Sequence, residues 1–185
     1  MLNPVAATRA RSRRAVWRRP RGFTMIEMAV VVAIIGILAA AGMPMMSEFM
    51  RDNQVRAMAE RFSDGLARAR IEAVQRNTTV DFVVDGKGWR IDLTDPVSGT
   101  TTKLREAPGI SADAQLTVTA SHAQLSFNGR GRAGASGFSI DLGHTAGTCA
   151  DAGGEIRCLR LTVSPLGAVR TCDPAVANTD PRACS

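Results

Sequence analysis

A long apolar run without a single charge covers residues 28–46, near the start of this 185-residue chain. Coiled as an α-helix, the run would be about 28 Å long, which matches the roughly 30 Å hydrocarbon core of a lipid bilayer. The sequence therefore predicts a helix here that spans a membrane. The arginine-rich segment before it predicts that the N-terminus stays on the cytoplasmic side.

The net charge of +6 belongs to the first 22 residues, which contain seven arginines and no acidic residue. The rest of the chain carries 16 basic and 17 acidic side chains. Overall charge therefore gives no support for nucleic-acid binding by the part of the chain that follows the leader.

Glu27 stands at the edge of the apolar run, where a carboxylate has no obvious use. A secretory signal peptide would account for the run, with the small residues 39–41 as a cleavage site, and so would a simple anchor. Neither explains Glu27, because a carboxylate within a membrane span costs a few kcal/mol on insertion scales.

The stretch RGFTMIEMAVVVAIIGILAAAG resembles the class III leader of type IV pilins and type II secretion pseudopilins. The resemblance implies that a prepilin peptidase cleaves after Gly22 on the cytoplasmic side. It also implies that the new N-terminal residue, Phe23, is N-methylated. Glu27 is then the fifth residue of the mature chain, the position at which the family has a glutamate.

The same resemblance suggests roles in filament assembly for Glu27 and Pro44. In a filament the apolar helices pack side by side, and Glu27 would pair with the α-amino group of Phe23 on a neighbouring subunit. An unpaired partner in an apolar core is heavily penalised, so such a pair would fix the register. Pro44 stands where many pilins have a helix-bending proline, and a kink is expected there.

After residue 47 the pattern predicts an amphipathic helix that continues to about Arg76, because apolar residues recur every three or four positions. From Thr78 the period changes to two, and residues 85–88 form the turn of a predicted hairpin. Trp89 and Phe127 are expected in the core of a small antiparallel sandwich. Further strands are predicted at 103–107, 115–119, 123–127, 137–142, 156–163 and 168–172.

The four cysteines lie close to the C-terminus, and targeting across a membrane makes two disulfides plausible. We favour Cys149–Cys158 and Cys172–Cys184, because each pair closes a short local loop, although four cysteines allow three pairings. The tail after Cys172 is then a loop closed by a disulfide.

No enzyme chemistry is apparent in the sequence. There is no phosphate loop, no nucleophile elbow and no convincing pair of carboxylates. His122 and His144 are isolated and are expected to be surface or structural residues. The sequence predicts no cofactor, no metal site and a binding or structural role.

The whole chain resembles the GspH/FimT family of type IV minor pilins and type II secretion pseudopilins. LSFNGRGRAG, residues 125–134, and LTVSPLGAVRTC, residues 161–172, are similar to strands of that family. The resemblance implies an α+β, pilin-like fold with a long N-terminal helix packed on a β-sandwich head. Its expected segments are a leader (1–22), a transmembrane or filament-core helix (23–46), an amphipathic helix (47–76) and a β-rich periplasmic head (77–185).

The FimT branch of the family is implicated in DNA uptake through a C-terminal Gly-Arg-x-Arg motif. Here residues 167–170 keep only Arg170, because Ala168 replaces the first arginine. A second match, at residues 129–132, contributes Arg130 and Arg132. Two arginines beside glycines can reach phosphates, but an ordinary solvated loop explains them as well.

Two functions follow from the resemblance. In the first, the chain is a minor pilin at or near the tip of a type IV pilus, where it primes assembly and contacts DNA during natural transformation. In the second, it is a GspH-like pseudopilin that acts in protein export. Its partners would be prepilin peptidase, inner-membrane lipid before assembly, and then other minor pilins and the major pilin, or pseudopilins.

Overall fold

The computed structural model describes residues 22–95, 97–109 and 115–184. The chain divides into two compact units, Met1–Gly42 and Met43–Ser185. Helix α1 (Met25–Arg76) supplies residues to both units. The predicted leader lies outside the described residues except for Gly22, and so do the side chains at positions 41 and 43–45. The predicted kink at Pro44 therefore stays a prediction.

The first unit consists, in its described part, of the beginning of α1 and the three residues before it. Most of its side chains are apolar and exposed, as in Met25, Ile26 and Leu38. Within the described residues, we find no helix with the combination of length and apolar character needed to cross a membrane.

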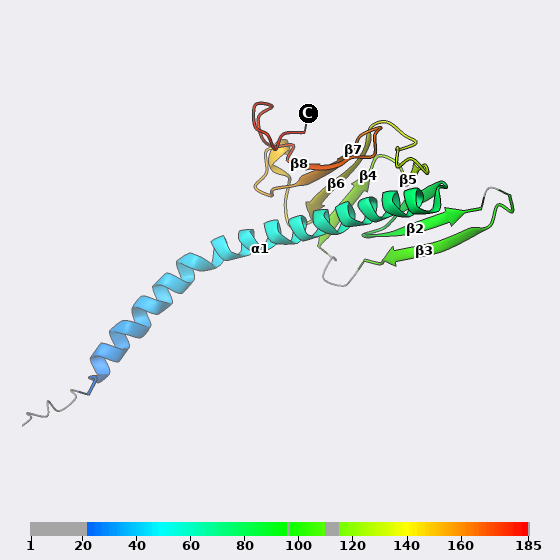
Figure 1. The fold of residues 1–185 in the computed structure, drawn as a ribbon. Helices are drawn as coiled ribbons and strands as arrows, with labels where there is room; N and C mark the ends of the chain where they lie inside the picture. Colours follow the sequence, from blue (N-terminus) through cyan, green and yellow to red (C-terminus); the bar gives the residue numbers. More distant parts are fainter. Residues whose placement is uncertain (1–21, 96, 110–114, 185) are drawn as a thin grey trace, which may run out of the picture. The chain divides into compact units, whose positions relative to one another are not determined.

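The second unit holds two four-stranded antiparallel sheets, shown in Figure 1 with the second half of α1. The first sheet has the order β3-β2-β1-β5, and its strands are β1 (Val80–Asp85), β2 (Gly88–Thr94), β3 (Thr101–Ala107) and β5 (Gln124–Phe127). The second has the order β4-β6-β7-β8, and its strands are β4 (Leu116–Ala120), β6 (Phe138–His144), β7 (Leu159–Val163) and β8 (Val169–Cys172). The predicted α+β fold with an antiparallel β-sandwich is confirmed.

One hydrophobic core joins α1 to both sheets. The ring of Phe62 meets that of Phe82 edge to face at 6.4 Å, and Phe82 lies 5.8 Å from Trp89. Such aromatic contacts add to the gain from burying apolar area. The buried residues of α1 recur at helical spacing, as the sequence predicts; they are Val55, Met58, Ala59, Phe62, Leu66, Ala69 and Ala73.

Two of the predicted elements differ from the observed ones at their boundaries. The strand predicted at 156–163 begins only at Leu159, because Ile156 instead bridges to Cys149 and the Cys149–Cys158 disulfide closes this segment into a loop. The strand predicted at 103–107 begins earlier, at Thr101, because β3 pairs with β2 from that residue on. The short loop between β2 and β3 contains a turn in which the Asp95 carboxylate accepts hydrogen bonds from the backbone N–H groups of Val97 and Ser98.

Asn77 follows the end of α1 with a left-handed backbone conformation, φ 49°. The N–H groups of Asn77 and Thr78 still donate to carbonyl groups of the last turn of the helix. A left-handed residue in this position commonly ends a helix, and asparagine tolerates the conformation better than most residues. The chain then enters β1 at Val80.

Candidate functional site

Thr24 caps the N-terminus of α1. The backbone N–H of Glu27 donates a hydrogen bond to Thr24 Oγ1 at 3.2 Å, and the N–H of Met28 donates to the carbonyl of Thr24. Threonine followed three positions later by glutamate is the sequence signature of a capping box. The carboxylate of Glu27 also lies in the first turn, where the helix dipole favours a negative charge.

The predicted processing site lies immediately before this cap. Gly22 and Phe23 have irregular, exposed backbone, and 76% of Phe23 is accessible. In the described part of the chain the Glu27 carboxylate makes no hydrogen bond or ion pair. The geometry is compatible with cleavage after Gly22 and with a partner for Glu27 that a single chain does not supply.

Arg130 and Arg132 lie in a tight turn between β5 and β6. The side-chain oxygen of Asn128 accepts hydrogen bonds from the backbone N–H groups of both arginines, each at 3.0 Å. Gly131 between them has a φ of 72°, which glycine adopts without the penalty that a Cβ would bring. Both arginine side chains are exposed and, among the described residues, have no hydrogen bond or ion pair.

This turn packs against the end of α1 and against the turn between β7 and β8. A Cβ on Gly129 would lie 2.7 Å from the backbone of Asn77, and a Cβ on Gly131 would lie 3.1 Å from Val74 Cγ2. The N–H of Ala133 donates to the carbonyl of Pro165 at 3.2 Å. The structure thus brings the two Gly-Arg segments, 129–132 and 167–170, to one region of the head.

Arg170 has a different environment from the other two candidate arginines. Its guanidinium group donates to the carbonyl oxygens of Pro181 (2.8 Å) and Ala183 (3.2 Å) in the C-terminal tail. The tail is closed by the Cys172–Cys184 disulfide. Arg170 therefore holds the tail in place, which is a structural role that the sequence motif does not reveal.

Both disulfides have the predicted pairing, Cys149–Cys158 and Cys172–Cys184. Within the second loop, Asp180 accepts two hydrogen bonds from the Arg182 guanidinium group. This interaction, helped by the backbone N–H of Arg182, lowers the pKa of Asp180 to about 2. The carboxylate is thus ionised throughout the neutral range, and its hydrogen bonds with Arg182 stabilise the turn before Cys184.

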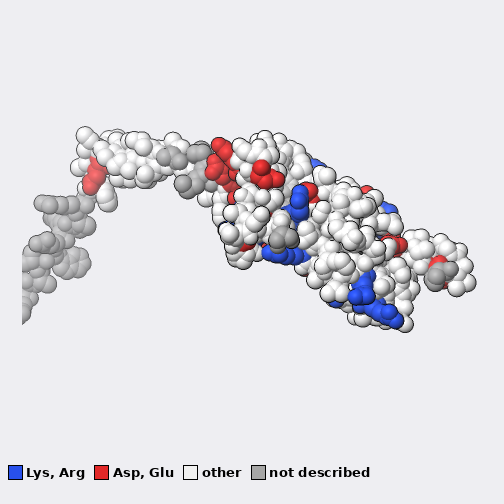
Figure 2. Space-filling model, turned by 90° about the horizontal axis from the view of Figure 1, so that it is seen from above, with Lys and Arg blue, Asp and Glu red and all other residues white. Residues whose placement is uncertain are grey.

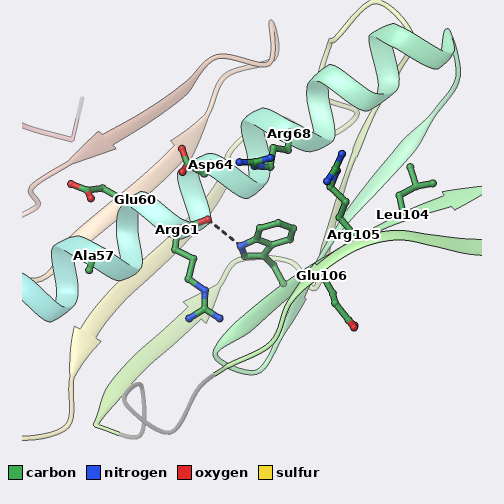
Figure 3. A pocket seen from close by; sticks show the side chains of 9 residues that line it. Ala57, Glu60, Arg61, Asp64, Arg68, Leu104, Arg105 and Glu106 are labelled. Atoms are coloured by element: carbon green, nitrogen blue, oxygen red, sulfur yellow. Dashed lines mark hydrogen bonds between the residues drawn. The ribbon is translucent and has the colours of Figure 1, made fainter.

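A groove of about 730 Å³ lies between α1 and the edge strand β3 (Figure 3). Its walls carry both signs of charge, including Asp64 and Arg68 on the helix. Trp89 also lines the groove, and its indole N–H donates to the carbonyl of Arg61 at 3.0 Å, the hydrogen bond drawn dashed in Figure 3. The Arg105 guanidinium group donates to Glu72 on the helix at 3.2 Å. This mixed lining favours no single class of charged ligand.

The charge distribution of the head is mixed as well. On the face shown in Figure 2, basic side chains form several separate patches with acidic groups between them. A continuous basic stripe is the usual footprint of a nucleic-acid interface, and that face does not present one.

His144 is a buried structural residue. Its Nδ1 accepts a hydrogen bond from the N–H of Ala146, so the proton resides on Nε2, which donates to Gln54 Oε1 at 3.2 Å. Both ring nitrogens are thereby satisfied within the fold. The sequence interpretation of His144 as a structural residue agrees with this arrangement.

The sequence reasoning missed Thr24 and Arg70. Thr24 could have been found from the spacing of threonine and glutamate. Arg70 lies in the contact of α1 with the two Gly-Arg segments, since a Cβ on Gly131 or Gly167 would come within 3.0 or 3.1 Å of its Nε. No local sequence pattern predicts that contact, because it depends on how the loops fold back on the helix.

Comparison with known proteins places these features in context. Among solved structures, the fold is similar to that of the type IV minor pilin FimU of Pseudomonas aeruginosa, with a TM-score of 0.54 and 24% identity over 71% of this chain and 98% of that one. A fimbrial protein of Moraxella nonliquefaciens is 37% identical over 79 residues, which are 43% of this chain and 49% of the relative. The type IV major fimbrial protein FimA of Dichelobacter nodosus is 43% identical over 68 residues, 36% of each chain. The chain thus spans half or less of the length of these two relatives.

Two family models match the sequence itself. The prokaryotic N-terminal methylation motif covers residues 17–43, the segment that contains Gly22, Phe23 and Glu27. The model described as type II transport protein GspH covers residues 58–167, which is more than half of the chain and runs from the amphipathic part of α1 to the turn before β8. The chain therefore belongs to the GspH family and carries the N-terminal methylation motif.

Proposed function

We propose that this protein is a minor pilin, incorporated at or near the tip of a type IV pilus, where it helps to prime assembly. The observation that carries the proposal is the apolar, exposed first part of α1, which follows an accessible Gly22-Phe23 step. The GspH family is structural and non-enzymatic, so the role to be explained is assembly.

The exposed side chains of this segment require a partner. The large aliphatic residues Ile26, Ile34 and Ile37 are 74%, 51% and 70% accessible. Burying one such side chain is worth about 1.5–3 kcal/mol, so a run of them strongly favours lipid or the helices of other subunits. We propose that lipid of the inner membrane holds the segment first, with the N-terminus in the cytoplasm, and that neighbouring subunits replace the lipid on assembly.

Glu27 restricts the partners of the first part of α1 to those that supply a positive charge for its carboxylate. Its carboxylate has no partner among the described residues, and an unpaired charge in an apolar filament core is costly. Cleavage after Gly22 would create an amino group on Phe23 of each subunit. Pairing of Glu27 with that amino group on a neighbour accounts for the acid, and Pro44 is proposed to bend the same helix.

The alternative is a pseudopilin of a type II secretion system. The name of the matching family, type II transport protein GspH, favours it, whereas the fold of FimU and the two fimbrial relatives favour the pilus. Both alternatives require the same processing and the same exposed helix. They differ in where the mature protein accumulates.

The experiment isolates sheared surface filaments and secreted proteins from cells with and without the gene. The proposal expects a mature chain that begins with N-methylated Phe23 in the pilus fraction, with fewer pili in the deletion strain. Normal piliation together with loss of a secreted protein would support the pseudopilin instead. If mass spectrometry finds an N-terminus other than Phe23, both the minor-pilin and the pseudopilin proposals are wrong.

Contact with DNA stays a prediction that now depends on Arg130 and Arg132, because Arg170 is bonded to the tail. Two phosphate contacts give weak and salt-dependent binding. Titration of duplex DNA at low salt into residues 43–185, which contain the whole core, compares the wild type with Arg130→Ala/Arg132→Ala. Equal affinity of the two proteins would exclude these arginines from DNA binding.

A further inference from the structure

Helix α1 has a second apolar stripe, which the head covers only in part. Ala67, Ile71 and Val74 follow one another at helical spacing, outside the stripe that packs on the sheets. Ile71 is 52% and Val74 49% accessible. A surface helix normally has one apolar face, so the second stripe marks a contact that the single chain does not satisfy.

The stripe forms one wall of a hollow of about 530 Å³, and Gly167 and Val169 at the turn between β7 and β8 line it too. Leu166 stands next to Gly167 in this turn and is 61% accessible. Aliphatic side chains of α1 and of the turn before β8, which lie far apart in the sequence, thus line the hollow or stand in the turn beside it. Contiguous exposed apolar patches of this kind are typical of interaction sites.

The turn that carries Leu166 is firmly held. The N–H of Gly167 donates to the carbonyl of Ser164 at 2.8 Å, and the N–H of Ala168 donates to Ser164 Oγ at 3.1 Å. Pro165 accepts from Ala133 of the neighbouring turn. Because the backbone is fixed before binding, little conformational entropy is lost when Leu166 is covered.

Arg70 supplies the charge of the hollow. It is the charged residue of the lining, and among the described residues its guanidinium group has no hydrogen bond or ion pair. An occupant with a carboxylate beside its apolar side chains would therefore match both features. A phosphate backbone could satisfy Arg70, but it would leave Ile71, Val74 and Leu166 without apolar contacts.

We infer that the hollow lined by Arg70, Ile71 and Val74, with Leu166 in the adjoining turn, docks an acidic, apolar segment of an adjoining filament subunit. The inference rests on the proposed function, since it takes the partner to be another subunit of the same filament. It adds to that function a specific contact made by the head, separate from the packing of the first part of α1.

The test places a photoactivatable phenylalanine analogue at Leu166 of the full chain, in cells that assemble filaments. We expect a cross-link to a filament subunit, at a segment with an aspartate or glutamate within one helical turn of the cross-linked residue. Arg70→Glu should lower the yield about fivefold, since an exposed ion pair is replaced by a repulsive one. Changing the partner's acid to lysine should restore the yield.

Arg68→Glu is the matched control, because Arg68 is on the same helix but lines the groove beside β3; its yield should equal that of the wild type. Arg70→Gln, which keeps a long polar side chain, should give an intermediate yield. Cross-links to DNA, to lipid or to a protein segment without an acidic residue would overturn the inference. A cross-linking yield that Arg70→Glu leaves unchanged would overturn it too.

A second photoactivatable position, at Ile34, separates this inference from the proposed function. Ile34 lies in the exposed apolar part of α1 and should cross-link to neighbouring subunits if the chain enters a filament at all. Cross-linking at Ile34 without cross-linking at Leu166 would reject the docking site alone. Absence of the chain from filaments would reject the proposed function, and the docking site with it.

Discussion

The indole ring of Trp89 lies directly against the backbone of Gly65 in α1. A Cβ on residue 65 would come within 2.5 Å of Trp89 Cε2, and the indole N–H donates to the carbonyl of Arg61 one turn earlier. The absence of a side chain at position 65 is thus what allows the first sheet to approach the helix. This contact fixes β2 on α1 and thereby the position of the head around the helix.

Gly65→Ala should destabilise the head by about 1–3 kcal/mol through overpacking, although alanine is intrinsically the better helix former by about 1 kcal/mol. Urea denaturation of residues 43–185, followed by circular dichroism, measures the change. In a Trp89→Leu background the same substitution should no longer destabilise, because the clashing ring is gone. A Gly65→Ala protein more stable than the wild type would show that the ring moves aside at little cost.

Glu72 on α1 pairs with two arginines, Arg76 on the same helix and Arg105 on β3. Its carboxylate accepts from Arg76 Nε at 3.0 Å and from Arg105 Nε at 3.2 Å. The hydrogen bond from Arg76 is the main reason that the pKa of Glu72 is lowered from 4.5. A lowered folded-state pKa means that this group stabilises the fold above the unfolded pKa, and that the stabilisation is lost as the pH falls through the folded value.

We therefore expect Glu72→Gln to reduce the free energy of unfolding at pH 7 by about 0.5–1 kcal/mol and to have less effect at pH 3. Urea titrations of both proteins across this range provide the measurement. Arg76→Gln should have a similar effect in the wild type and almost none in the Glu72→Gln background. A constant difference between wild type and Glu72→Gln from pH 7 to pH 3 would contradict the assignment.

Arg170 is predicted to act on the tail. Hydrogen bonds from a charged donor are worth about 1.5–3 kcal/mol each, so Arg170→Ala should loosen the segment that carries Pro181 and Ala183. Limited trypsin digestion should then cleave after Arg182 at least about tenfold faster, because cleavage follows the open population. Mass spectrometry of the intact protein gives the rate.

Arg132→Ala is the control for this experiment, since the Arg132 side chain is exposed and, within the described residues, unpaired. It should leave cleavage after Arg182 unchanged. Equal rates for Arg170→Ala and the wild type would mean that the Cys172–Cys184 disulfide alone holds the tail.

The sequence predicted the fold well where burial alone determines the pattern. The apolar residues of α1 between Val55 and Ala73 are the ones in the core, because a helix that packs on a sheet must bury one face. Alternation in β1 and the turn at residues 85–88 likewise specified the hairpin. The disulfide pairing followed from short loop closure.

The functional surfaces were harder to predict, because they depend on contacts between distant segments. Arg170 resembles a free binding residue in the sequence, yet its acceptors are backbone carbonyls 11 and 13 residues later. Backbone carbonyls carry no sequence signal. The hollow beside Arg70 was missed because a helix is ordinarily assigned one apolar face, and Ile71 and Val74 lie outside it.

Thr24 and Glu27 make separable contributions to the start of α1. Thr24 Oγ1 accepts from the N–H of Glu27, so Thr24→Ala removes a cap worth about 1 kcal/mol and Thr24→Ser keeps it. The carboxylate of Glu27 takes no part in that hydrogen bond.

If the Glu27 carboxylate pairs with the amino group of Phe23 on a neighbour, Glu27→Gln and Glu27→Ala should both be cleaved and N-methylated normally but enter filaments poorly. Thr24→Ala should enter filaments nearly as well as the wild type. Immunoblots of sheared pili against whole cells, with mass spectrometry of the N-terminus, measure both steps. Normal incorporation of Glu27→Gln would show that the negative charge is dispensable and that the acid serves the helix terminus alone, because a neutral glutamine cannot neutralise an amine inside an apolar core.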